Sequence, residues 1–128
     1  MYKNLTITSV LGLLGIILGA FGAHALKNKL SIDAFDSFQT AIRYQMYHVV
    51  VLLIVNLFNG FTSKQKKVLS ILFIVGIVMF SGSIYAIYLL GISAKSIWFV
   101  TPIGGLFFVV GWLMMTIYFM KKLSKTNS

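Results

Sequence analysis

LTITSVLGLLGIILGAFGAHAL, residues 5–26, contains no formally charged side chain. A helix needs about 20 apolar residues to cross the hydrocarbon core of a bilayer, and this stretch is long enough. Lipid offers no partner to an unpaired backbone group, so a spanning segment is expected to be helical. Residues 68–94 and 97–120 meet the same criterion, and residues 44–61 are a fourth candidate whose strongly polar members are His48, Asn56 and Asn59. The sequence therefore predicts four helices joined by short connections.

The composition also favours a bilayer as solvent. Hydrophobic residues make up 59% of the chain and charged residues only 10%, whereas soluble domains carry about a quarter charged residues. A chain of 128 residues has too much surface per volume to hide this much apolar area in water. We predict an all-α polytopic membrane protein, a single domain over residues 1–128 with four transmembrane helices in an antiparallel bundle, at about 5–26, 32–61, 67–92 and 102–122.

The net charge is +9, and its distribution favours lipid over nucleic acid as partner. The lysines form short clusters between apolar runs, where they meet anionic headgroups. Four spans place both termini and the middle connection on one side, and the positive-inside rule makes that side cytoplasmic in the cell membrane. Seven cations fall on it and four on the other side: Lys3, Lys64, Lys66, Lys67, Lys121, Lys122 and Lys125 against Lys27, Lys29, Arg43 and Lys95.

The first helix has an alternative interpretation as a signal peptide. Ala23-His24-Ala25 resembles a small-x-small cleavage site, but the apolar run over 5–21 exceeds the usual core of about 7–15 residues. Four glycines in residues 5–26 are spaced to share one helix face, where small residues let a second helix approach closely. We therefore expect a retained helix with a packing stripe formed by Gly12, Gly15, Gly19 and Gly22.

Local signals mark two helix starts. Ser31 is placed to cap a helix beginning at Ile32, whose amphipathic first turns are expected to lie in the outer interface before the chain enters the membrane. Thr101-Pro102 is typical of a cap followed by proline at the first helical position.

The two histidines of the chain lie at the edges of the first two spans. Antiparallel packing brings them to the same leaflet, where ionisable groups are expensive and often functional. A structural role as interhelical hydrogen-bonding groups is the main alternative, and proton handling, a pH sensor and a metal site are the others. Two histidines are few ligands for zinc, so no metal is predicted. The candidate binding cluster in the outer leaflet is His24, Arg43, Tyr44, Tyr47 and His48.

A second polar group is expected near the midplane, where the third and fourth helices face each other. The indole N–H of Trp112 needs an acceptor in hydrocarbon, and a serine hydroxyl of the facing third helix is the expected candidate. We predict that this group packs helices together and does not bind substrate. Its members are Ser81, Gly82, Ser83, Gly104, Gly105 and Trp112.

No residue pattern indicates an enzyme: the sequence contains no nucleophile–base pair, phosphate-binding loop or carboxylate dyad. No catalytic residue and no cofactor are predicted. The expected function is to bind a lipid, a small molecule or another membrane protein through the outer cluster. An oligomeric transporter or channel, with a pore around the glycine stripe, and a subunit of a larger membrane complex are the alternatives.

Four segments together resemble the DUF423 (UPF0382) family of small membrane proteins. They are GAFGAHALKNKL at 19–30, FQTAIRYQMYHVVVLL at 38–53, FSGSIYAIYLLG at 80–91 and TPIGGLFFVVGW at 101–112. The resemblance implies a four-helix inner-membrane protein in bacteria and no established activity. It places these residues at motif positions: His24, Arg43, Tyr44, Gln45, His48, Ser81, Gly82, Ser83, Thr101, Pro102, Gly104, Gly105 and Trp112.

Overall fold

The computed structural model describes all 128 residues and contains helices but no strands. Four long helices are each long and apolar enough to cross a membrane, which confirms the predicted fold class. In chain order the elements are α1 (Tyr2–Phe21), a π-helical turn η1 (Gly22–Leu26), α2 (Ile32–Leu57), α3 (Ser63–Leu89), the short α4 (Ala94–Ile97) and α5 (Val100–Thr126).

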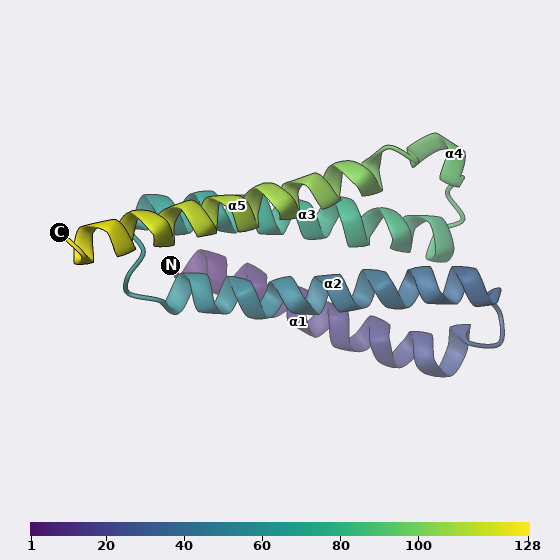
Figure 1. Cartoon of the computed structure of the whole chain (residues 1–128). Helices are drawn as coiled ribbons and strands as arrows, with labels where there is room; N and C mark the ends of the chain where they lie inside the picture. The colour runs from purple at the N-terminus through teal and green to yellow at the C-terminus, as the bar shows by residue number, and fades with distance from the viewer.

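The four long helices lie roughly antiparallel, and both termini and the α2–α3 connection gather at one end (Figure 1). We call this the terminal end; the opposite end holds the α1–α2 connection and α4. The helices pack in chain order, α1 on α2, α2 on α3 and α3 on α5. No direct packing of comparable extent joins α1 to α3 or α2 to α5.

The residues that flank the helices decide where each helix begins and ends, and some of these ends differ from the predicted positions. Ser31 Oγ accepts the backbone N–H of Ala34 at 3.2 Å, so α2 begins at Ile32 as predicted. It ends at Leu57 and not at 61, because Phe58 is extended. α3 begins at Ser63, four residues before the predicted start, because Thr62 and Gln65 form a reciprocal capping box.

The outer boundaries differ too. α3 ends at Leu89, before Gly91, which has a positive φ of 70°. α5 runs over Val100–Thr126 and so exceeds the predicted 102–122 at both ends. The predicted Thr101 cap is wrong: Thr101 lies inside α5, and its hydroxyl pairs with that of Ser83 on α3. The amphipathic beginning of α2 belongs to one continuous helix, as predicted (Figure 1).

The glycine stripe of α1 packs as predicted, and its partner is α2. A methyl group added at Gly15 would lie 2.5 Å from Met46 Sδ, and one added at Gly22 would lie 2.6 Å from the Phe38 ring. Gly12 and Gly19 face α2 in the same way. Because α2 covers this stripe, it is not a free surface around which further copies would build a pore.

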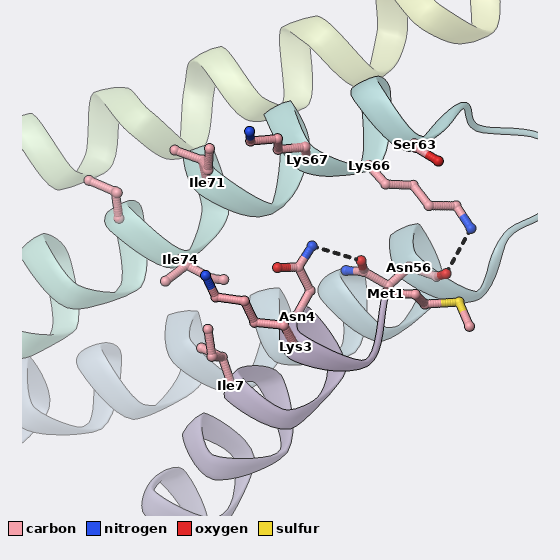
Figure 2. A pocket seen from close by; sticks show the side chains of 11 residues that line it. Met1, Lys3, Asn4, Ile7, Asn56, Ser63, Lys66, Lys67, Ile71 and Ile74 are labelled. Carbon is pink, nitrogen blue, oxygen red and sulfur yellow. Dashed lines mark hydrogen bonds between the residues drawn. The ribbon is translucent and has the colours of Figure 1, made fainter.

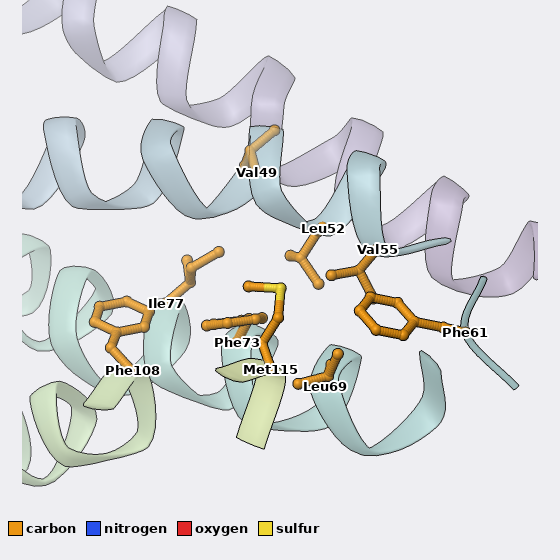
Figure 3. Close-up of a cluster of buried hydrophobic side chains, with 9 residues drawn as sticks. All are labelled: Val49, Leu52, Val55, Phe61, Leu69, Phe73, Ile77, Phe108 and Met115. Carbon is orange, nitrogen blue, oxygen red and sulfur yellow. The ribbon is translucent and has the colours of Figure 1, made fainter. Parts of the chain in front are cut away.

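The largest group of buried apolar side chains joins α2, α3 and α5 (Figure 3). Two glycines let aromatic rings enter the α3–α5 interface: Phe108 lies against Gly76, and Phe73 lies against Gly111. In lipid such close packing replaces the hydrophobic effect as the force between helices. The members of the core are Val49, Leu52, Val55, Phe61, Leu69, Phe73, Ile77, Phe108 and Met115.

The predicted midplane group is only partly correct. Gly104 does pack tightly, since an added methyl would lie 2.3 Å from the backbone nitrogen of Phe80. Gly105 has room for one at 3.9 Å, and Gly82 has no atom within 4 Å. Ser81 Oγ donates to the carbonyl of Ala41 on α2 at 2.6 Å, so it ties α3 to α2 and does not meet Trp112.

Candidate functional site

The five residues of the predicted outer cluster do not converge on one cavity. His24 is exposed on the π-helical turn. Arg43 is exposed, and its Nη2 donates to Thr40 Oγ1 at 3.1 Å, one turn nearer the start of α2. Tyr44 lies beside Tyr47 and His48, with ring centroids 6.1 and 6.4 Å apart. The structure therefore brings three members of the predicted cluster together.

His48 also lies deeper than predicted. It follows the start of α2 at Ile32 by sixteen residues, or about 24 Å of helix, and not by one or two turns. Its ring stacks on Phe108 with centroids 3.8 Å apart, and it is only 5% exposed. The prediction was wrong because it counted only the uncharged part of α2 as helix inside the membrane.

Both ring nitrogens of His48 are engaged. Trp112 Nε1 donates to His48 Nε2 at 3.1 Å, and His48 Nδ1 lies 2.6 Å from the carbonyl oxygen of Tyr44. An indole N–H is only a donor, so Nε2 must offer a lone pair and the ring proton sits on Nδ1, which donates to that carbonyl. The acceptor for Trp112 is thus a histidine and not a serine. This geometry is that of a neutral imidazole that holds α2 to α5.

Gln45 is a structural residue that the sequence showed only as a motif position. Its Nε2 donates to the carbonyl of Leu11 on α1 at 2.7 Å, and its Oε1 accepts the hydroxyl of Tyr85 on α3 at 2.6 Å. It is 2% exposed and joins three helices. The signal was its spacing, because Gln45 shares a face of α2 with the buried Phe38, Ile42 and Val49.

A cavity of about 620 Å³ opens between α1, α2 and α3 at the terminal end, and we call it the terminal cavity (Figure 2). Three cationic side chains line it: Lys3 from α1, and Lys66 and Lys67 from α3. The amides of Asn4 and Asn56 form part of its wall. Its apolar lining consists of Met1, Ile7, Ile71, Ile74 and Val75.

Hydrogen bonds hold the polar wall of the terminal cavity in place. Asn4 Nδ2 donates to Asn56 Oδ1 at 3.2 Å, which joins α1 to α2. Asn56 Nδ2 donates to Ser70 Oγ at 2.9 Å, which joins α2 to α3. Lys66 Nζ donates to the backbone oxygen of Asn56 at 2.8 Å, as drawn in Figure 2. An ammonium group has three N–H donors, so this lysine keeps two for another acceptor.

The electrostatics of the terminal cavity are one-sided. Three ammonium groups line it and no carboxylate does, since both acidic residues, Asp33 and Asp36, lie in the first turns of α2 at the opposite end. The cations of this cavity lie near the starts of α1 and α3, and its aliphatic side chains lie further along both helices. This order of charged and apolar walls matches an anionic amphiphile. The sequence predicts that these lysines meet anionic headgroups on one side of the membrane, but it does not show that residues 3, 66 and 67 surround one space.

Four membrane-length helices that leave a lysine-lined cavity at one end define a small polytopic membrane protein. The chain belongs to the DUF423 family, described as proteins of unknown function, whose family model matches residues 18–105. This confirms the resemblance noted in the sequence.

Curated relatives from several bacteria are similar to this chain. It is 46% identical to a UPF0382 membrane protein of Staphylococcus saprophyticus over 99 residues, 77% of this chain and 81% of the relative. It is 36% identical to one of Haemophilus influenzae over 115 residues, 88% and 90% of the two chains. It is 35% identical to YwdK of Bacillus subtilis over 113 residues, 87% and 90%. No solved structure matches the chain.

Proposed function

We propose that this protein binds an anionic lipid of the membrane through the terminal cavity. The observation that carries the proposal is the lining itself: Lys3, Lys66 and Lys67 at the polar end and isoleucines deeper in the same space. Clusters of lysine next to a membrane span attract anionic headgroups. The binding function expected from the sequence is retained, while its site moves from the outer cluster to the terminal end.

The apolar lining favours a lipid over a small soluble anion. Ile7 on α1 faces Ile71 and Ile74 on α3 below the lysines, so the cavity continues from charged to aliphatic walls. A free phosphate would fill only the part of the cavity that the lysines line. A phospholipid places its phosphate among the ammonium groups and its chains against the isoleucines, which matches both parts.

We also propose that the terminal end faces the cytoplasm. Seven of the eleven cations of the chain lie at this end, and the positive-inside rule assigns such an end to the cytoplasmic side. The chain has no cysteine, so single cysteines can report its orientation. In intact cells a membrane-impermeant maleimide should label Lys95→Cys at the opposite end and leave Lys64→Cys unlabelled. The reverse pattern would contradict the orientation.

Native mass spectrometry in mild detergent tests the lipid site directly. Purified protein is titrated with dihexadecanoyl phosphatidylglycerol and, in parallel, with the zwitterionic phosphatidylcholine of the same chains. We expect a one-to-one complex with the anionic lipid and weaker binding of the zwitterionic one. Lys3→Gln with Lys67→Gln removes two ammonium groups, each worth about 1 kcal/mol at a membrane surface, so binding should weaken by about thirtyfold.

The matched control removes the same charge from the same end outside the cavity. Lys121→Gln with Lys125→Gln changes two exposed lysines of α5 that do not line the terminal cavity. This variant should bind phosphatidylglycerol as the unmodified chain does. Equal loss in both double variants would show general attraction to the lysine-rich end and would overturn the proposal, as would equal affinity for the two lipids.

A further inference from the structure

We infer that one acyl chain of the bound lipid lies in a groove between α1 and α3 and extends as far as Gly82. The inference rests on the proposed function, because it concerns the chain of the lipid whose headgroup occupies the terminal cavity. It predicts that the protein distinguishes lipids of equal charge by the length of their chains.

The groove and the terminal cavity follow one another along the same two helix faces. A second cavity of about 190 Å³ lies between α1 and α3, with Leu11, Leu14 and Leu18 on the α1 side. On α1 these leucines follow Ile7 of the terminal cavity at steps of four, three and four residues, so they share one face. On α3, Val78 and Gly82 follow Ile71 and Val75 in the same way.

The groove has an apolar interior because its one polar floor residue is already satisfied. Gln45 of α2 lies between α1 and α3, but its amide is bonded to the carbonyl of Leu11 and the hydroxyl of Tyr85. The space between the two helices stays open because α1 does not pack directly on α3 to any large extent. A hydrocarbon chain meets these requirements without leaving a polar group unpaired.

Gly82 marks the far end of the space. A methyl group added at any other glycine of the four long helices would have a side-chain or backbone atom of another residue within 4 Å, whereas one added at Gly82 would have none. Gly82 follows Ile71 by eleven residues, which is about 16 Å of helix. This matches about half of the roughly 30 Å hydrocarbon core. A chain that spans its leaflet therefore reaches Gly82, and a chain half as long does not.

The charges favour a lipid over a second copy of the chain as occupant. The groove begins among three lysines with no carboxylate, and a lipid brings a phosphate to that place. The chain itself offers only Asp33 and Asp36, both at the other end of the bundle. A helix is also about 10 Å wide with its side chains, which is large for a cavity of about 190 Å³.

The test uses two phosphatidylglycerols with the same headgroup, one with hexadecanoyl and one with octanoyl chains. Gly82→Leu places a side chain in the groove. We expect it to weaken binding of the hexadecanoyl lipid by about tenfold and to leave octanoyl binding unchanged. Gly105→Leu is the matched control, because a methyl at Gly105 makes only ordinary contact with Phe80 and this residue lies outside the groove. It should change neither affinity.

A second pair of variants serves if Gly82→Leu does not fold. Val78 lines the groove and is 58% exposed, and Val109 is 62% exposed on α5 away from it. Val78→Phe should reproduce the selective loss, and Val109→Phe should not.

The outcomes separate the two proposals. If groove variants leave both affinities unchanged while Lys3→Gln with Lys67→Gln weakens both, the headgroup site stands and the groove inference is overturned. Equal loss of both lipids in Gly82→Leu, or a dimer whose formation the groove variants abolish, overturns it as well. If the unmodified chain binds neither lipid, the proposed function fails, and the inference with it.

Discussion

Helix α3 has two long faces, and they differ in what fills them. Toward α5, the rings of Phe73 and Phe108 enter the spaces left by Gly111 and Gly76, and the backbones meet at Gly104. Toward α1, Gly82 and the surrounding aliphatic side chains border an open groove. Glycine therefore has two roles in this bundle. On the face toward α5 it lets side chains and backbone of the neighbouring helix pack closely, and on the face toward α1 it leaves the groove unfilled. The comparison predicts that the same substitution is strongly destabilising on the face toward α5 and nearly neutral on the face toward α1.

The largest expected effect is at the backbone contact of the filled face. Gly104→Ala would place a methyl 2.3 Å from the backbone nitrogen of Phe80, which a side-chain movement cannot relieve. We expect the free energy of unfolding to fall by about 3 kcal/mol, measured by denaturant titration in detergent micelles. Gly105→Ala, one residue away with room for a methyl, is the control and should be nearly neutral. Equal stability of the two variants would show that α3 and α5 are not this close.

A smaller effect is expected for the hydrogen bond that joins α2 to α5 beside this face. Trp112→Phe removes the donor to His48, and His48→Phe removes the acceptor while keeping a ring against Phe108. Polar pairs between membrane helices average about 0.6 kcal/mol. A double-mutant cycle on the free energy of unfolding should give a coupling of that size. A coupling of zero would mean that the indole and the imidazole do not form a stabilising hydrogen bond.

The smallest effect is expected on the open face. Gly82→Ala adds a methyl with no atom within 4 Å, so the free energy of unfolding should change by less than about 0.5 kcal/mol. Gly76→Ala, on the same helix, places its methyl 2.6 Å from the Phe108 ring and should be clearly destabilising. The same unfolding titration compares the two. A large loss at Gly82 would show that protein fills the groove in the membrane.

Much of the fold was predictable because its signals are local. The absence of charge over residues 5–26 predicts a span, and the glycine spacing in this segment predicts a packing face. Ser31 predicts the start of α2, and the structure shows its capping bond. α3 begins before the predicted residue 67, although Thr62 and Gln65 carry a local signal, because the apolar pattern begins only after the capping box. A capping box acts on the backbone and is independent of the apolar pattern.

The candidate site was less predictable, because its residues are distant in the chain. His48 and Trp112 are 64 residues apart, and Asn4 and Asn56 are 52 apart. Topology can place such residues at one end of the bundle, but it does not say which helix faces meet. The predicted outer cluster failed to converge for this reason: Arg43 and Tyr47 are exposed on α2, while His48 is buried against α5 and α3.

The sequence by itself determined that this chain is a four-helix membrane protein of the DUF423 family, with its lysines concentrated at the end that holds both termini. These properties follow from the transfer of side chains between water and lipid, which depends on each segment alone. Only the tertiary structure decided that α2 covers the glycine stripe, that Trp112 meets His48 and that Lys3, Lys66 and Lys67 surround one cavity. Between helices in lipid the discriminating force is close packing, and packing depends on shapes brought together from distant parts of the chain.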